Sequence, residues 1–286
     1  MRDDFAIFIL THGRADQQRT WRTLRDSGYT GKIYLLIDDL DEQKDRYQKR
    51  YRDSVIVFDK RAQAEKTDTF FNGEELRAVV YARNASFEIA EEMGLKWFVN
   101  CDDDISRFDF KMPIEGKLKT AKIRNMDAVL ESVIRFMEDT GTRAVSFSEG
   151  GNYIGGVNGK VRGGVNWMLS HFFMFRAGDP MRFRSVWYED RIFSNDKAKE
   201  GLPIFGLMQV AITLPTPESR AAEKQEGGMH EAYEESGAYI ASFCVAMAHP
   251  DHEKVYIGYK GKRWNNKRRS VAAGPKIISS RYQKAR

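Results

Sequence analysis

The sequence has little cysteine and no long apolar run, and both absences exclude classes of protein. Its two cysteines, Cys101 and Cys244, lie far apart with no CxxC spacing, so neither a disulfide framework nor a cysteine zinc site is expected. No apolar stretch approaches the roughly 20 residues of a membrane helix, and MRDDFAIF lacks the pattern of a secretory signal. We therefore expect a soluble, cytoplasmic protein without a membrane partner.

Acidic residues are absent from 254–286, a segment that contains eleven of the 46 Lys and Arg residues. The rest of the chain carries 35 basic against 41 acidic side chains, so the net charge of +5 arises at this end. Basic side chains beside Trp264 suit a nucleic-acid backbone, and a solvated chain end explains the same composition. The candidate DNA-binding cations are Lys260, Lys262, Arg263, Lys267, Arg268 and Arg269.

Strand-like and helix-like segments alternate in the first half of the chain. Strands are predicted at Ala6–Leu10, Ile33–Ile37, Val55–Phe58 and Trp97–Val99, and helices at Asp16–Ser27 and Glu74–Met93. This alternation predicts an α/β fold with a mainly parallel, Rossmann-like sheet flanked by helices. A further strand is predicted at Ala144–Ser148, and HFFMF (171–175) is interpreted as a core strand.

Polar residues follow each predicted strand. Because ligands bind at the carboxyl ends of parallel strands, these residues are expected to line one crevice. They are Thr11, His12, Gly13 and Arg14 after the first strand, Asp38, Asp39 and Asp41 after the second, Asp59 and Lys60 after the third, and Asp102, Asp103 and Asp104 after the fourth.

Three consecutive aspartates after a buried strand are electrostatically costly unless a cation lies among them. Oxygen ligands without a nearby His or Cys favour Mg²⁺ or Mn²⁺, with substrate phosphates completing the coordination. A helix cap or a solvated turn is the alternative interpretation of this triplet. The hydrophobic strand before it and the surrounding crevice favour the metal.

The segment YARNASFEIAEEMGLKWFVNCDDD (81–104) places Arg83 and Asn84 near the start of a helix, from which they could reach a nucleotide. Its Ala-Arg-Asn motif and its strand ending in Asp-x-Asp resemble the donor-binding half of GT-A glycosyltransferases. The resemblance implies that Asp102 and Asp104 hold the metal on a sugar donor's diphosphate, and that Asp103 contacts the donor.

Further motifs follow in the second half: GGNYIGG (150–156), NWMLSHFFMF (166–175), WYEDRIF (187–193), EGGMHEAYEESGAYIASF (226–243) and GPKIISSRY (274–282). With VFDKR (57–61), they resemble the TET/JBP-associated DNA glycosyltransferases, found largely in phages and related to the base J glucosyltransferase. A phage-encoded member would act in the host cytoplasm. The family attaches a sugar to a hydroxymethylated pyrimidine in DNA.

An acceptor hydroxyl needs a carboxylate to remove its proton in an inverting transfer. Asp190, with Glu189 beside it, is the candidate base, although a helix N-terminus also explains this pair. Trp187 and Tyr188 are the aromatics expected to contact the acceptor. Gly155 and Gly156 are expected to let the backbone approach the acceptor, with ordinary turns as the alternative.

Donor contacts are assigned to Thr11, His12, Gly13, Arg14, Asp38, Asp39, Lys60, Arg83, Asn84 and Asp103. A third metal ligand could come from His230 or His249. We expect one GT-A domain over 1–286, with 1–110 as the donor half, 111–253 as the acceptor half and 254–286 as a basic segment.

The predicted activity is metal-dependent transfer from a UDP-sugar to 5-hydroxymethylcytosine or 5-hydroxymethyluracil in DNA. The alternatives are a glycosyltransferase with a glycan or protein acceptor, a metal-dependent nuclease or nucleotidyltransferase, and a non-enzymatic nucleic-acid-binding module. Residue spacing does not determine the sugar, the modified base or the stereochemistry.

Overall fold

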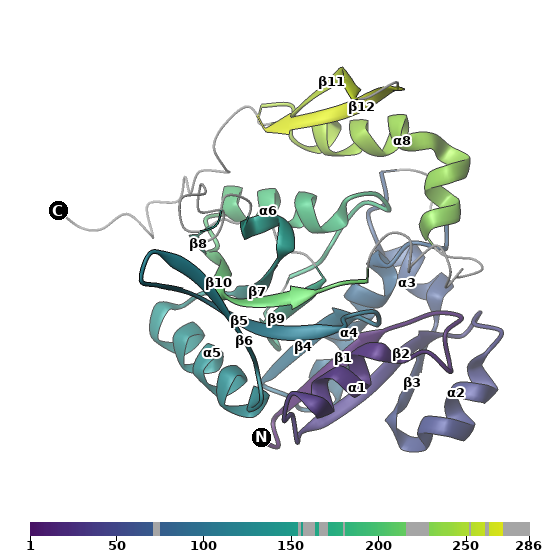
Figure 1. The fold of residues 1–286 in the computed structure, drawn as a ribbon. Coiled ribbons are helices and arrows are strands. Elements are labelled where there is room, and N and C mark those ends of the chain that lie inside the picture. The colour runs from purple at the N-terminus through teal and green to yellow at the C-terminus, as the bar shows by residue number, and fades with distance from the viewer. Residues whose placement is uncertain are drawn as a thin grey trace.

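The computed structural model describes residues 1–70, 75–153, 156, 164–165, 171–179, 181–215, 229–251, 253–260 and 263–270. Within these ranges, ten strands form one sheet in the order β3-β2-β1-β4-β9-β7-β10-β5-β6, with β8 also pairing with β10 (Figure 1). The strands are β1 Phe5–Leu10, β2 Lys32–Asp38, β3 Val55–Phe58, β4 Trp97–Asp102, β5 Arg107–Ile114, β6 Lys117–Lys122, β7 Ala144–Glu149, β8 Gly164–Val165, β9 Phe172–Arg176 and β10 Ile204–Thr213.

The helices are α1 Arg19–Asp26, α2 Lys44–Tyr51, α3 Lys60–Lys66, α4 Val80–Glu92, α5 Met126–Thr140, α6 Glu189–Lys199 and α8 Met229–Ala248. Two 3₁₀ turns, η1 Arg52–Ser54 and η2 Gly150–Tyr153, precede β3 and follow β7. Among the helices that the structure describes, none is both long enough and apolar enough to cross a membrane.

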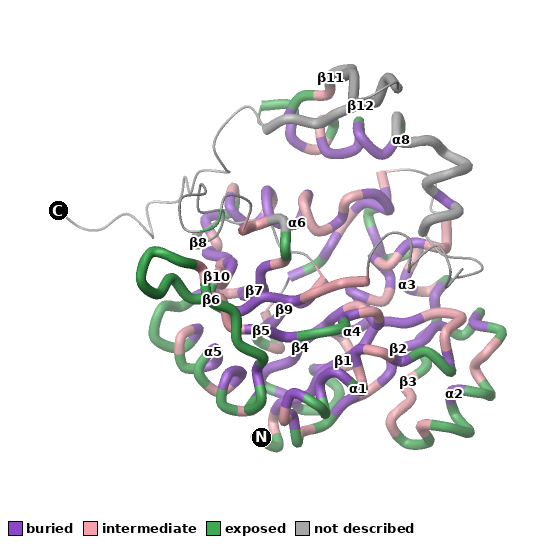
Figure 2. Tube along the Cα trace, in the orientation of Figure 1, coloured by how far each residue is buried: buried purple, intermediate pink, exposed green. Residues whose placement is uncertain are grey.

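Both faces of the sheet are covered, as β1 illustrates. Phe5, Ile7 and Ile9 pack on one face with residues of α1, α2 and α5, whereas Ala6 and Phe8 pack on the other face with residues of α4, α6 and α8. All five side chains are fully buried, which explains why this strand is a continuous apolar run and not an alternating one. Figure 2 shows the buried strands running through the centre of the fold.

The predicted α/β sheet is confirmed, and all six strand predictions, including HFFMF, coincide with observed strands. Both predicted helices begin later than expected, at Arg19 and Val80. Before α1, the amide of Gln18 binds the hydroxyl of Thr11 and the carbonyl of Arg14, at 2.9 Å each. These bonds hold residues 11–18 as a loop.

Strand β9 interrupts the parallel order because it runs antiparallel to both neighbours, β4 and β7. Its first residue therefore lies at the edge where β4 and β7 end. The antiparallel β5 and β6 extend the sheet beyond β10. None of these pairings has a local sequence signal.

The basic C-terminal segment forms an antiparallel hairpin where the structure describes it. Strands β11 (Glu253–Lys260) and β12 (Arg263–Ser270) pair along their whole length and pack on α8 (Figure 1). Lys260, Arg263, Lys267, Arg268 and Arg269 therefore lie in a β-hairpin, whereas Lys262 lies outside the described residues.

Candidate active site

The loops that follow β1, β2 and β3 meet through an ion cluster around Asp38. The carboxylate of this buried residue lies 2.9 Å from both His12 Nδ1 and Lys60 Nζ. Burial alone would raise the pKa of Asp38, but His12 and Lys60 together lower it below its usual value. Asp38 is thus held ionised between two partners from neighbouring loops.

The loop after β1 is also fixed by the middle aspartate of the triplet. Thr11 Oγ1 donates to one oxygen of Asp103 at 2.6 Å, and Arg14 Nη1 donates to the other at 2.8 Å. Burial raises the pKa of Asp103 to about 6, although Arg14 and Thr11 oppose the rise. Asp103 therefore anchors the loop that precedes α1.

Two further aspartates hold backbone groups of these loops. Asp41 accepts the backbone N–H of Gly13 at 2.8 Å, and Gly13 has a φ of +66°, which only glycine adopts at little cost. Exposed Asp39 accepts the backbone N–H of Lys60 at 2.9 Å. The predicted donor residues after β1, β2 and β3, together with Asp103, thus lie together at the carboxyl edge.

Arg83 connects the end of β4 with the start of α6, two segments that are far apart in the sequence. Its guanidinium is buried, with Nε 3.0 Å from Glu189 Oε1 and Nη2 3.3 Å from Asp102 Oδ1. The guanidinium also lies over the ring of Phe173, 4.4 Å from its centre. Instead of extending toward a donor phosphate, Arg83 bridges a predicted metal ligand and a predicted catalytic carboxylate.

Glu189 and Asp190 form the first turn of α6. Their position therefore also agrees with the alternative interpretation of this pair as acidic residues at a helix N-terminus. Burial raises the pKa of Glu189 to about 7, with Asp190 adding to the rise and Arg83 opposing it. Asp190 is half-buried and accepts the backbone N–H of Arg191. Tyr188 precedes the helix with a φ of +53°, a left-handed conformation that is strained for tyrosine.

His171 is a site residue that the sequence interpretation did not single out. Its Nδ1 lies 2.6 Å from Asp102 Oδ2, and its Nε2 lies 3.7 Å from Glu149 Oε2. Burial would lower the pKa of His171, but Asp102, helped by Glu149 and Asp190, raises it to about 9. Its position as the first residue of HFFMF, directly before β9, becomes informative only when β9 is known to run antiparallel.

Two predicted contact residues have structural roles in this conformation. The amide of Asn84 donates to Thr67 Oγ1 and to the carbonyl of Phe183, and it accepts the N–H of Phe183. These bonds occupy the amide, so Asn84 positions the segment before α6 and not a donor. Trp187 is 3% exposed and packs in the core, so its ring does not face an acceptor.

Asp102 and Asp104 are half-buried at the open end of β4, and their oxygen chemistry fits Mg²⁺ or Mn²⁺. Among the described residues, no group of three or more acidic, His or Cys side chains is arranged to hold a metal. A cation would therefore need phosphate oxygens to complete its coordination. Two histidines were the candidates for a third metal ligand. Of these, His249 lies 3.1 Å from Asp196, and the side chain of His230 lies outside the described residues.

The glycine loop is described only in part. Gly156 is exposed, with a φ of +58° and open space where a Cβ would lie. Gly155 lies outside the described residues.

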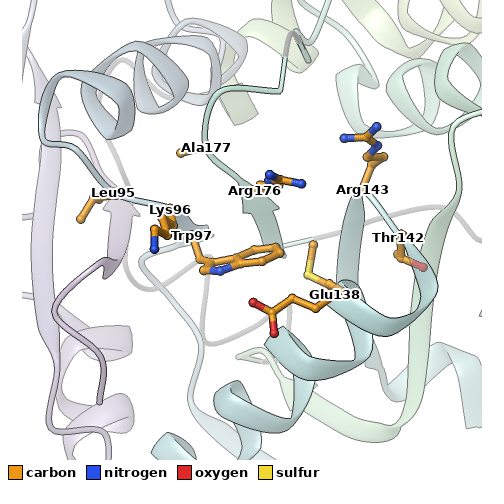
Figure 3. Close-up of a pocket in the computed structure, with 10 residues that line it drawn as sticks. Leu95, Lys96, Trp97, Glu138, Thr142, Arg143, Arg176 and Ala177 are labelled. Carbon is orange, nitrogen blue, oxygen red and sulfur yellow. The ribbon is translucent and has the colours of Figure 1, made fainter.

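One cavity in the described part of the chain lies away from these residues. Its volume is about 480 Å³, and it lies at the opposite edge of the sheet, where β4 begins and β9 ends. Figure 3 shows Trp97, Glu138, Arg143 and Arg176 around it. The catalytic candidates therefore occupy an open edge and not this cavity.

Three of the solved structures that are similar to this chain illustrate the range of the likeness. S. aureus TarS 1-349 is 14% identical, with a TM-score of 0.45, over 85% of this chain and 64% of that chain. A mannosyltransferase from Pyrobaculum calidifontis, in complex with GDP-Man and Mn²⁺, is 12% identical, with a TM-score of 0.48. The match covers 88% of this chain and 75% of that chain. GalNAc-T7 with UDP, GalNAc and Mn²⁺ is 12% identical, with a TM-score of 0.42. The match covers 78% of this chain and 44% of that chain. The chain spans 38% of a longer TarS structure.

Among curated proteins, none matches the sequence. The model of one family, TET-Associated Glycosyltransferase, matches residues 5–216, which is well over half of the chain. This match confirms the resemblance drawn from the motifs and removes the nuclease and non-enzymatic alternatives. The protein belongs to the TET-associated glycosyltransferase family.

Proposed function

We propose that this glycosyltransferase moves a sugar from a UDP-sugar to the hydroxyl of a hydroxymethylated pyrimidine in DNA, 5-hydroxymethylcytosine or 5-hydroxymethyluracil. The observation that carries the proposal is the Arg83 bridge, which brings Asp102 and the Glu189–Asp190 pair to one edge of the sheet. This is the juxtaposition that group transfer from a diphosphate requires.

The donor binds at the carboxyl ends of β1, β2 and β3. His12, Asp38 and Lys60 are fixed to one another there, and Asp103 holds Thr11 and Arg14. Side chains that are already fixed lose little conformational entropy when a ligand arrives. These groups, with Gly13 and Asp39, are suited to orient the nucleoside diphosphate.

Asp102 and Asp104 would hold Mn²⁺ or Mg²⁺ against the donor phosphates. When bound, the cation acts as a Lewis acid that neutralises the charge of the leaving diphosphate. His171, with Nδ1 2.6 Å from Asp102 Oδ2, would help to hold that carboxylate in position.

Asp190 takes the proton of the acceptor hydroxyl as its oxygen attacks the sugar carbon. The new bond joins that oxygen to the sugar, and the bond between the sugar and the diphosphate breaks. Glu189 has a pKa raised to about 7, close to the range in which a general base is effective. Arg83 keeps Glu189 in place beside Asp190.

DNA is the acceptor that best accounts for the basic end of the chain. Lys260, Arg263, Lys267, Arg268 and Arg269 lie on the β11–β12 hairpin, and Lys262 lies between its strands in the sequence. A base within a duplex is reached from the major groove or by flipping the nucleotide out. Tyr188 and Gly156 are the residues proposed to meet that base.

The test is a panel of UDP-sugars with Mn²⁺ or Mg²⁺ and duplexes that contain either hydroxymethylated base. Mass spectrometry of the digested nucleosides should detect an added hexose or pentose with at least one donor. Unmodified duplex is the matched control. A sugar transferred only to a glycan or a protein would contradict the DNA acceptor and leave the glycosyltransferase assignment in place.

A further inference from the structure

Strands β5 and β6 form a stiff ribbon that leaves the sheet. β5 pairs with β10 only from Arg107 to Phe110, whereas it pairs with β6 from Asp109 to Ile114. The turn is a two-residue loop, Glu115 and Gly116, with φ values of +50° and +71°. Positive φ at both positions is the type I′ turn that matches strand twist and gives a tight hairpin.

The outer part of this ribbon is exposed. Residues 112–117 and 119–122 are all exposed (Figure 2), including Met112 at 40% and Ile114 at 44%. Figure 1 shows the ribbon projecting past α5. At about 3.4 Å per residue, the eight residues of β5 reach roughly 25 Å.

The ribbon is cationic on both faces. Lys117 and Lys119 lie opposite Ile114 and Met112 on one face, while Lys111 and Lys122 lie opposite Thr120 and Asp109 on the other. Glu115 is the acidic residue at the tip, and Asp109 is buried at the base and paired with Arg107. Lysines on both faces suit a groove with two phosphate walls, and a major groove admits a two-stranded ribbon.

Lysine also protects exposed edge strands from pairing with other chains, but this role explains less of the pattern. The opposite edge strand of the same sheet, β3, has the sequence VIVF and carries no lysine. Edge protection does not require four cations spread over two faces.

Two contacts connect the ribbon to the proposed site. Ser106 donates to the carbonyl of Thr213 through its N–H and its hydroxyl, at 2.8 Å each, and thereby fixes the chain between Asp104 and β5. Lys111 Nζ lies 5.6 Å from the ring centre of Tyr153, in the loop predicted to approach the acceptor. A duplex on the ribbon would therefore pass close to that loop.

We propose that the β5–β6 ribbon binds the phosphate backbone of duplex DNA and holds the duplex against the transfer site. This inference rests on the proposed function, because it names a second surface for the same acceptor. Because its lysines would contact phosphates, they contribute affinity without base recognition.

The test compares Lys117→Gln/Lys119→Gln with the wild-type chain in binding to an unmodified duplex, measured by fluorescence anisotropy at several salt concentrations. The expected result is an affinity lower by on the order of tenfold and a salt slope smaller by about two. Lys49→Gln/Arg135→Gln removes two exposed helical cations and should leave both values unchanged. Lys117→Arg/Lys119→Arg should bind like the wild type.

Two outcomes would overturn the inference, and they are distinguishable. In the first, the wild type binds the duplex, and the Gln variant, which gel filtration shows to be monomeric, binds it equally well. Only the assignment of the ribbon as a DNA-binding surface would then be wrong. If the wild type binds neither unmodified nor hydroxymethylated duplex, the DNA acceptor of the proposed function fails as well.

Discussion

The proposed donor side and the proposed transfer side of the carboxyl edge differ in the pKa values of their buried carboxyl groups. Around Asp38, His12 and Lys60 hold the carboxyl pKa below its usual value, so its charge is fixed near neutral pH. Around Arg83, burial raises the pKa of Glu189 to about 7. The cluster around Asp38 therefore keeps a permanent charge, whereas the cluster around Arg83 keeps a carboxyl group that titrates near neutrality.

This difference suits the two tasks. A donor site must present the same charge pattern to every diphosphate that arrives, because electrostatic complementarity sets recognition. A transfer site must take a proton from the acceptor: Asp190 is the proposed base, and the carboxyl group of Glu189 beside it can hold a proton near neutral pH. The following predictions test whether this division holds.

The largest expected effect is on catalysis, from Asp190→Asn. Loss of the proposed base should lower kcat by about 10²–10⁴-fold and leave the KM for the donor nearly unchanged. Steady-state kinetics with a hydroxymethylated duplex would measure both constants. A variant with full kcat would assign the base to another residue, and Glu189→Gln is the parallel variant.

Arg83→Met should cause the largest loss of stability. It leaves Glu189 and Asp102 without their shared cation, and breaking a buried ion pair in this way costs about 3–5 kcal/mol. Urea unfolding would measure the loss, with Arg83→Lys as the charge-preserving control. An Arg83→Met protein as stable as the wild type would show that the bridge does not hold the two carboxylates together.

Lys60→Met should have a smaller effect, on the donor side. Removing one of two partners of the buried Asp38 should cost about 1–3 kcal/mol at neutral pH. Because the folded pKa of Asp38 is lowered, its contribution is present above the unfolded pKa and is lost as the pH falls through the folded value. The cost of the variant should therefore shrink in acid, and a cost independent of pH would contradict the ion pair.

The last expected effect is the pH dependence of the contribution of Glu189 to stability. Its folded pKa is raised from 4.5 to about 7, so its contribution to stability is complete below 4.5 and is lost as the pH rises toward 7. The Tm of Glu189→Gln should therefore rise relative to that of the wild type between pH 4.5 and 7. Each kcal/mol of stability that the wild type loses over this range corresponds to a difference in Tm of on the order of 2–4 °C. A constant difference between pH 4.5 and 7 would contradict the raised pKa.

The sequence predicts the donor side well because the signals there are local. Each strand is a short apolar run, and the polar residues follow it directly, so parallel order alone brings Thr11, Asp38 and Lys60 together. The same reasoning places the proposed metal ligands Asp102 and Asp104 at the end of a strand, and the structure has both half-buried at the end of β4.

The transfer side depends on contacts between distant segments, which a single sequence does not reveal. Arg83 and Glu189 are separated by 106 positions, and His171 reaches Asp102 across 69. The sequence predicts Arg83 and Asn84 as donor contacts because a position near a helix start favours that role. Burial against α6 and the segment before it directs both side chains inward.

The reversed direction of β9 has a consequence for how the enzyme could diversify. The chain leaves the carboxyl edge at Glu149 and returns to it at His171, and these two side chains lie 3.7 Å apart. A segment whose two ends meet can change in length or sequence without shifting the strands it connects. Exchanging the chain between Glu149 and His171 for that of a relative should therefore alter the proposed acceptor side and leave the proposed donor side in place, provided that the pairing of β8 with β10 is kept.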